Sequence, residues 1–105
     1  MGLSEMTDQL NICLAQLNPI VGDLPGNAEK LLTAAKVAAE NGADLVVTSE
    51  LFLCGYPPED LVRRPSFLEQ IEVAVSALAQ ATSGGPAILL GTPWRESGRV
   101  FNAAL

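Results

Sequence analysis

Short apolar runs alternate with stretches of helical periodicity in the first half of this chain. The run Leu10–Leu17 is partly alternating and is closed by Asn-Pro, which is typical of a buried strand. Residues 28–40 then place apolar side chains on one helical stripe, and the preceding Asn27 is expected to cap this helix. A second apolar strand starts at Leu45. Strand, helix and strand in this order predict a βαβ unit with parallel strands.

The second half of the chain repeats this alternation. The segment Ser49–Pro65 is expected to be a long loop stiffened by two consecutive prolines. Ser66 and Glu69 match the capping box that begins a second helix. The apolar run Ala87–Gly91 predicts a third parallel strand, and residues 92–98 are expected to form a turn.

A fourth apolar strand is expected to begin at Val100 and to run to Leu105. It reaches the last residue without a turn or a cap, whereas domains rarely stop partway through an apolar strand. We therefore expect an α/β chain in which helices cover a parallel sheet. Residues 1–9 are expected to be a flexible polar tail, and residues 10–105 to be one domain that is truncated within a strand.

The amino-acid composition and the net charge argue against some classes of binding partner. The chain of 105 residues is 49% hydrophobic and 17% charged, as globular domains are, and its net charge is −6. An acidic surface repels phosphate backbones and anionic lipids, so we expect neither nucleic-acid nor membrane binding. No apolar run approaches the roughly 20 residues of a membrane span, and the N-terminal sequence lacks the features of a signal peptide. The cytoplasm is the expected compartment.

The cysteines and the absence of histidine restrict the possible chemistry. With no histidine and no CxxC spacing, these residues form neither the usual zinc sites nor a Ser-His-Asp or Cys-His pair, and no metal site is expected. Cys54 lies close to Glu50, but a thiolate nucleophile needs a base or a cation, and the only lysines lie on the first predicted helix. We therefore do not expect Cys54 to be a nucleophile, and we expect Cys13 to be a core residue.

Glu50 is the first candidate for a functional side chain. It follows the second predicted strand, and ligands of open parallel sheets collect beyond the carboxyl ends of the strands. Its neighbours are apolar, so the carboxylate is expected to be buried. Burial would raise its pKa into the range that is useful to a general base. The alternative is a glutamate that caps a helix or faces water at a strand end.

Tyr56 is the second candidate. It places an aromatic hydroxyl six residues after Glu50, on a loop stiffened by Pro57 and Pro58. Rigid loops that carry a polar aromatic side chain often form the wall of a pocket. A packed tyrosine in a turn would give the same spacing, and the local pattern does not separate the two interpretations.

Several blocks of this sequence, taken together and in order, resemble the carbon–nitrogen hydrolase (nitrilase) superfamily. The resemblance runs from Leu10 almost to the end of the chain. Its blocks are Ala15–Pro19, Val21–Asp23, Gly26–Asn27, Ser49–Leu61 and Gly91–Pro93. Within the superfamily, the sequence Gly-Tyr-Pro-Pro-Glu-Asp-Leu is most similar to the amidase domains of bacterial glutamine-dependent NAD+ synthetases.

The resemblance implies an αββα sandwich, of which this chain would supply the first βαβαβ segment. It also implies a Glu-Lys-Cys triad in which Glu50 is the general base, with Tyr56 close to the pocket for the substrate glutamine. The lysine and the nucleophilic cysteine of that triad would lie downstream of Leu105. The 105 residues by themselves are therefore expected to be inactive.

The resemblance further implies the reaction of the parent enzyme. Glutamine amide hydrolysis would supply ammonia for NAD+ synthesis from nicotinic acid adenine dinucleotide, with ATP and Mg2+ used by a C-terminal synthetase domain that this chain lacks. No cofactor is expected in the chain itself, and the full-length enzyme is expected to be a homo-oligomer. Two alternatives stay open: a stand-alone amidase of a carbamoyl or ω-amide compound, and a non-catalytic α/β binding module.

Overall fold

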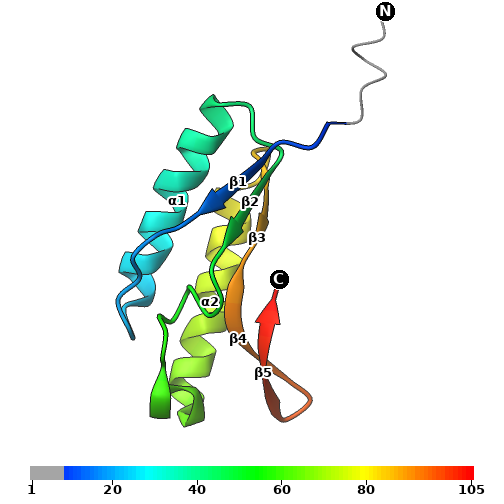
Figure 1. Cartoon of the computed structure of the whole chain (residues 1–105). Coiled ribbons are helices and arrows are strands. Elements are labelled where there is room, and N and C mark those ends of the chain that lie inside the picture. The colour runs from blue at the N-terminus through cyan, green and yellow to red at the C-terminus, as the bar shows by residue number, and fades with distance from the viewer. Residues whose placement is uncertain (1–8) are drawn as a thin grey trace, which may run out of the picture.

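The computed structural model describes residues 9–105, so the predicted tail of residues 1–9 lies outside the described residues except for Gln9. Strands and helices alternate along the chain (Figure 1). The elements are β1 (Ile12–Ala15), α1 (Leu24–Glu40), β2 (Leu45–Thr48), the short 3-10 helix η2 (Glu59–Arg63), α2 (Pro65–Ala81), β3 (Ala87–Leu89), β4 (Gly91–Glu96) and β5 (Arg99–Ala104).

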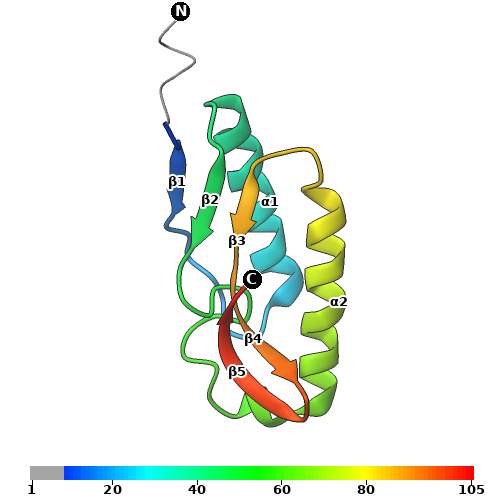
Figure 2. The same ribbon diagram turned by 90° about the vertical axis from the view of Figure 1, so that its right-hand side faces the viewer.

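The strands β1, β2 and β3 form a parallel sheet in that order, which confirms the predicted βαβ arrangement. Figure 2 shows both helices on one side of this sheet. That placement follows from two successive right-handed crossovers in the same direction. The second sheet is the antiparallel pair of β4 and β5. In the part of the chain that the structure describes, neither helix is long and apolar enough to cross a membrane.

The core lies between the helices and the parallel sheet. It is built from buried side chains of both helices, of β2 and of the segment that follows β2, among them Leu31, Ile71, Val46 and Phe52. The opposite face of the sheet is uncovered: Ile12 is 50% and Leu14 is 68% exposed, and Leu89 is 40% exposed. The first strand is therefore buried on one face only, and it is shorter than the predicted run.

Helix α1 begins earlier than the sequence pattern predicts. It starts at Leu24, and the carboxylate of Asp23 caps it by accepting a hydrogen bond from Gly26 N at 3.0 Å. Proline is well tolerated in the first turn of a helix, so Pro25 is part of α1 rather than of a preceding loop. The predicted cap at Asn27 is wrong, because this side chain is fully buried within the helix.

The predicted capping box of the second helix is also wrong. Helix α2 begins at Pro65, and its capping residue Arg64 makes no side-chain capping bond. The proline suits the first position of a helix, so the start lies before Ser66 and this serine becomes part of the first turn. The face of α2 that packs into the core carries the buried residues Phe67, Leu68, Ile71 and Leu78.

The segment predicted as a turn, residues 92–98, is instead mostly strand β4. Only Ser97 and Gly98 form the turn to β5, with φ values of +51° and +77°. Leu90 and Leu105 exchange both backbone hydrogen bonds, and such pairs alternate with non-hydrogen-bonded pairs in an antiparallel ladder. Because the two kinds of pair alternate along the ladder, the pair of Pro93 and Asn102 is non-hydrogen-bonded. The N–H group that proline lacks therefore costs no hydrogen bond to β5. The predicted fourth strand is confirmed as β5.

Candidate functional site

Glu50 lies just beyond the carboxyl end of β2, as expected, on a tight turn. Strand β2 ends at Thr48, and Phe52 N donates to Ser49 O at 3.2 Å to close the turn. Leu51 within this turn has a φ of +52°, a value that residues with a side chain seldom adopt. The backbone that carries Glu50 therefore reverses sharply, and the apolar residues after it enter the core.

The first residue of β4 holds this turn in place. Gly91 N donates to Thr48 Oγ1 at 2.9 Å, and Leu53 N donates to Gly91 O at 3.1 Å. A Cβ atom at Gly91 would lie 2.3 Å from Ser49 O and 3.2 Å from the Cα atom of Glu50. Only glycine allows β4 to approach the turn so closely.

The Glu50 side chain is exposed, so the expected burial of this carboxylate is wrong. Its apolar neighbours Leu51 and Phe52 turn into the core and leave the carboxylate outside. Its Oε2 accepts a hydrogen bond of 2.6 Å from the side-chain amide of Asn102 on β5. An ionised carboxylate that accepts an amide N–H forms a short, charge-assisted bond.

Glu50 and Asn102 face a small hollow of about 240 Å³ at the carboxyl ends of β2 and β3. Its lining residues are Val47, Thr48, Ser49, Glu50, Leu89, Gly91, Asn102, Ala103 and Ala104. The set offers one carboxylate, one amide and two hydroxyls on an apolar floor. It can accept a proton and orient a small polar molecule, but it contains neither a thiol nor a cation.

Asn102 is a site residue that sequence analysis missed. A signal was present, because Asn102 is the only polar residue in the run Val100–Leu105. A single amide in an otherwise apolar strand indicates a specific partner. That partner is 52 positions away along the chain, and only the pairing of β4 with β5 brings the two side chains together.

Tyr56 does not join Glu50 at this hollow. The Tyr56 side chain is 64% exposed, so the interpretation as a packed tyrosine is wrong. Tyr56 is also not among the residues that line the hollow. The loop that carries it is firmly held, since Gly22 N donates to Cys54 O at 2.8 Å. The buried Asn27 amide also donates to Leu53 O at 2.9 Å. Tyr56 is thus an exposed side chain on an anchored backbone.

Cys54 is fully buried, as an inert core thiol should be. Its Sγ donates to Gly55 O at 3.2 Å, and burial raises its pKa to about 11, although a backbone hydrogen bond offsets part of the rise. The thiolate is therefore disfavoured at neutral pH. Cys13 on β1 is half-buried and packs against the core, as expected.

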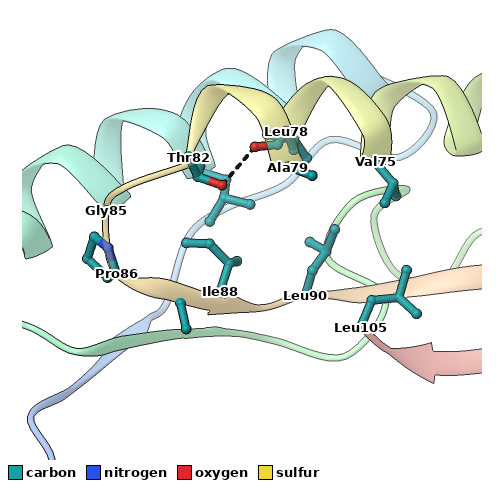
Figure 3. Close-up of a pocket in the computed structure, with 11 residues that line it drawn as sticks. Val75, Leu78, Ala79, Thr82, Gly85, Pro86, Ile88, Leu90 and Leu105 are labelled. Atoms are coloured by element: carbon teal, nitrogen blue, oxygen red, sulfur yellow. Dashed lines mark hydrogen bonds between the residues drawn. The ribbon is translucent and has the colours of Figure 1, made fainter.

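A second, apolar hollow of about 360 Å³ lies between α2 and β3 (Figure 3). Val75, Leu78, Ile88 and Leu90 point into it, and the one hydrogen bond drawn there joins the Thr82 hydroxyl to the helix backbone. It has no charged side chain and no convergent polar groups, so we assign it no chemistry. Within residues 9–105, no group of three or more metal-ligating side chains exists.

Relatives of this chain carry the same segment within much longer proteins. The chain is 54% identical over 81 residues to the glutamine-dependent NAD(+) synthetase of Synechocystis sp., covering 77% of this chain and 14% of that protein. It is 46% identical over 98 residues to the enzyme of that name from Rhodobacter capsulatus, covering 93% of this chain and 18% of that protein. The chain thus spans less than a fifth of these relatives.

Solved structures show the same helix-and-sheet arrangement, which confirms the expected nitrilase-like α/β fold class. A glutamine-dependent NAD+ synthetase from Acinetobacter baumannii, solved with adenosine diphosphate, superposes with a TM-score of 0.82 at 30% identity, over 89% of this chain and 18% of that one. An amidase from Nesterenkonia sp. superposes with a TM-score of 0.74 at 33% identity, over 83% of this chain and 33% of that one. Residues 11–105 match the carbon–nitrogen hydrolase family, and the chain belongs to that family.

Proposed function

We propose that this chain is the N-terminal part of the glutaminase domain of a glutamine-dependent NAD+ synthetase, with Glu50 as its general base. The observation that carries the proposal is the position of Glu50. Its carboxylate stands at the carboxyl end of a parallel strand, faces a hollow, and has its backbone fixed by Gly91. The names of these two relatives supply the reaction.

In the proposed reaction, Glu50 removes the proton from a cysteine thiol as the sulfur attacks the side-chain amide of glutamine. It passes this proton to the departing ammonia and then activates the water that releases glutamate. A lysine ammonium stabilises the oxyanion. Both the cysteine and the lysine are proposed to come from residues beyond these 105, because none of the residues that line the hollow is a cysteine or a lysine. Tyr56 is proposed to approach glutamine from its anchored loop.

The ammonia is proposed to serve NAD+ synthesis from nicotinic acid adenine dinucleotide in a C-terminal synthetase domain. In the described part of the chain, no group of three or more His, Cys, Asp or Glu side chains could hold the Mg2+ that accompanies ATP in that step. No step is therefore assigned to them within this chain. Assembly of the full-length enzyme as a homo-oligomer, in the cytoplasm, is part of the same proposal.

The test is Glu50→Gln in the complete polypeptide that contains this segment. We expect glutamine hydrolysis to fall by a factor of about 100 to 10,000, the usual contribution of a general base. NAD+ synthesis driven by added ammonium should continue, because that reaction bypasses the glutaminase domain. Ammonia release and NAD+ formation are measured with glutamine and with ammonium as the nitrogen source.

Glu40→Gln is the control for this test, since Glu40 is an exposed carboxylate at the end of α1, away from the hollow. It should leave both activities unchanged. Glutamine-driven synthesis that survives Glu50→Gln would refute the role of Glu50. A parallel assay of the 105-residue chain alone should release no ammonia from glutamine.

A stand-alone amidase is the second candidate, favoured by the 33% identity to the Nesterenkonia amidase. It predicts hydrolysis of a carbamoyl or ω-amide compound without formation of NAD+ from any nitrogen source. A non-catalytic binding module predicts that Glu50→Gln changes neither activity. The same assays therefore separate all three candidates.

A further inference from the structure

The carboxylate of Glu50 is held by a side chain that the reaction described above does not use. Asn102 Nδ2 donates to Glu50 Oε2 at 2.6 Å, which is short for an N–H···O bond. The bond joins the turn after β2 to strand β5, so it fixes the side chain against an element that is distant in sequence.

The hairpin of β4 and β5 also fixes the backbone of the same residue. Gly91 on β4 contacts the turn that carries Glu50, and Gly91 pairs with Ala104 on β5, two residues from Asn102. The backbone of Glu50 is thus held by Gly91 and its side chain by Asn102, two nearby positions of the hairpin of β4 and β5. Such a double restraint sets the direction in which the free oxygen of the carboxylate points.

We propose that Asn102 is the positioning residue of Glu50: its amide holds one carboxylate oxygen and keeps the other directed into the hollow as the proton acceptor. The proposal rests on the proposed role of Glu50 as general base. An amide donor stabilises the ionised carboxylate, which is the form that accepts a proton. A donor that is itself neutral does so without placing a competing charge in the hollow.

The surroundings of the pair leave Glu50 as the group on which the amide acts. Among the residues that line the hollow, from β2, the turn after it, β3, β4 and β5, Glu50 is the only titratable side chain. Loss of the amide donor would free the carboxylate to turn away from the hollow, so the catalytic step should slow while binding of the substrate is retained.

The experiment compares Asn102→Leu and Asn102→Asp with the wild type in the complete polypeptide. Asn102→Leu keeps the approximate size of the side chain and removes the donor. We expect kcat for glutamine hydrolysis to fall about ten- to a hundredfold with little change in KM, as loss of a hydrogen bond to a charged group predicts. Asn102→Asp also removes the donor and places a second carboxylate beside Glu50, so kcat should fall at least as far.

Phe101→Ala is the matched control on the same strand. Phe101 is 48% exposed and points to the opposite side of β5, so its loss weakens the hairpin without touching Glu50. This variant should leave kcat for glutamine hydrolysis close to the wild-type value. Asn102→Asp keeps the shape of the side chain and serves as the second variant if the leucine variant fails to fold.

An unchanged kcat in both Asn102 variants would overturn the positioning role. If Glu50→Gln still abolishes glutamine hydrolysis in that case, the proposed function stands and only the role of Asn102 fails. If Glu50→Gln leaves hydrolysis intact, the proposed function itself fails. A comparable fall of kcat in Phe101→Ala would also overturn the proposal, because a general loosening of β5 would then explain the result.

Discussion

Burial separates the chemistry of the two thiols in this chain. Cys54 is fully buried and its pKa is raised to about 11, because burial disfavours the charged thiolate. The neutral thiol therefore persists as the pH rises through the ordinary thiol range, and about one molecule in a thousand carries the thiolate at pH 8. Cys13 lies on the edge strand β1 and is only half-buried.

We therefore expect iodoacetamide at pH 8 to leave Cys54 unmodified in the native protein while Cys13 reacts. Both cysteines should react once the protein is unfolded, since the protection of Cys54 comes from burial. Peptide mass spectrometry of the alkylated protein measures the two sites separately. Rapid native labelling of Cys54 would show that this thiol is accessible, and would reopen its assignment as a core residue.

Single residues also mark the limit of what the sequence could predict about the site. The position of Glu50 followed from local rules, because it comes directly after an apolar strand and such ends collect ligands. Its exposure did not follow, since the turn that sends Leu51 and Phe52 inward depends on Gly91, about forty positions later. Asn102 was missed for the same reason, because its bond to Glu50 exists only through tertiary pairing.

Among the elements, proline accounts for most differences between predicted and observed boundaries. The sequence pattern predicts that the first helix starts at residue 28 and assigns Pro65 to a loop, yet Pro25 and Pro65 each lie in the first turn of a helix, where proline is tolerated. Pro93 suggested a turn, yet it occupies a non-hydrogen-bonded position of β4. The apolar periods of both helices and of the parallel strands were sufficient to predict the elements themselves. The boundaries depend on hydrogen-bond partners that the local pattern does not contain.

The contact between β4 and the turn after β2 leads to a prediction about Gly91→Ala. The added Cβ would lie 2.3 Å from Ser49 O and 2.9 Å from Leu51 N, both of them backbone atoms that cannot rotate away. We expect the free energy of unfolding to drop by about 1–3 kcal/mol, as overpacking usually costs. Glutamine hydrolysis should fall as well, because the turn that carries Glu50 must move.

Gly85→Ala is the matched control for this variant. The nearest atom to a Cβ at Gly85 is Thr82 O at 3.5 Å, an ordinary contact distance. This variant should therefore unfold at nearly the denaturant concentration of the wild type. Chemical denaturation and glutamine hydrolysis of the two variants test the contact. Equal stability of both would show that the close approach at Gly91 is not required.

The molecule as a whole has one covered and one uncovered face of its parallel sheet. Both helices pack on one side, and apolar side chains of β1 and β3 lie open on the other. A sheet is stable when layers cover both faces, and in an αββα sandwich a second sheet covers the inner one. The single sequence predicted the helix layer well, because periodicity encodes it. From the sequence, the first strand is predicted to be buried, because an apolar run does not reveal what packs against each of its faces.

This asymmetry predicts different effects for the same substitution on the two sides of the molecule. Ile12 on the uncovered sheet face and Val37 on α1 are almost equally exposed, at 50% and 51%. In the complete polypeptide, Ile12→Lys should lower the free energy of unfolding by at least about 2 kcal/mol, because a second layer would bury the ammonium without a partner. Val37→Lys should change it by less than about 0.5 kcal/mol, as exposed substitutions usually do. Urea denaturation of both variants measures the difference, and equal values would mean that this face of the sheet stays open to water.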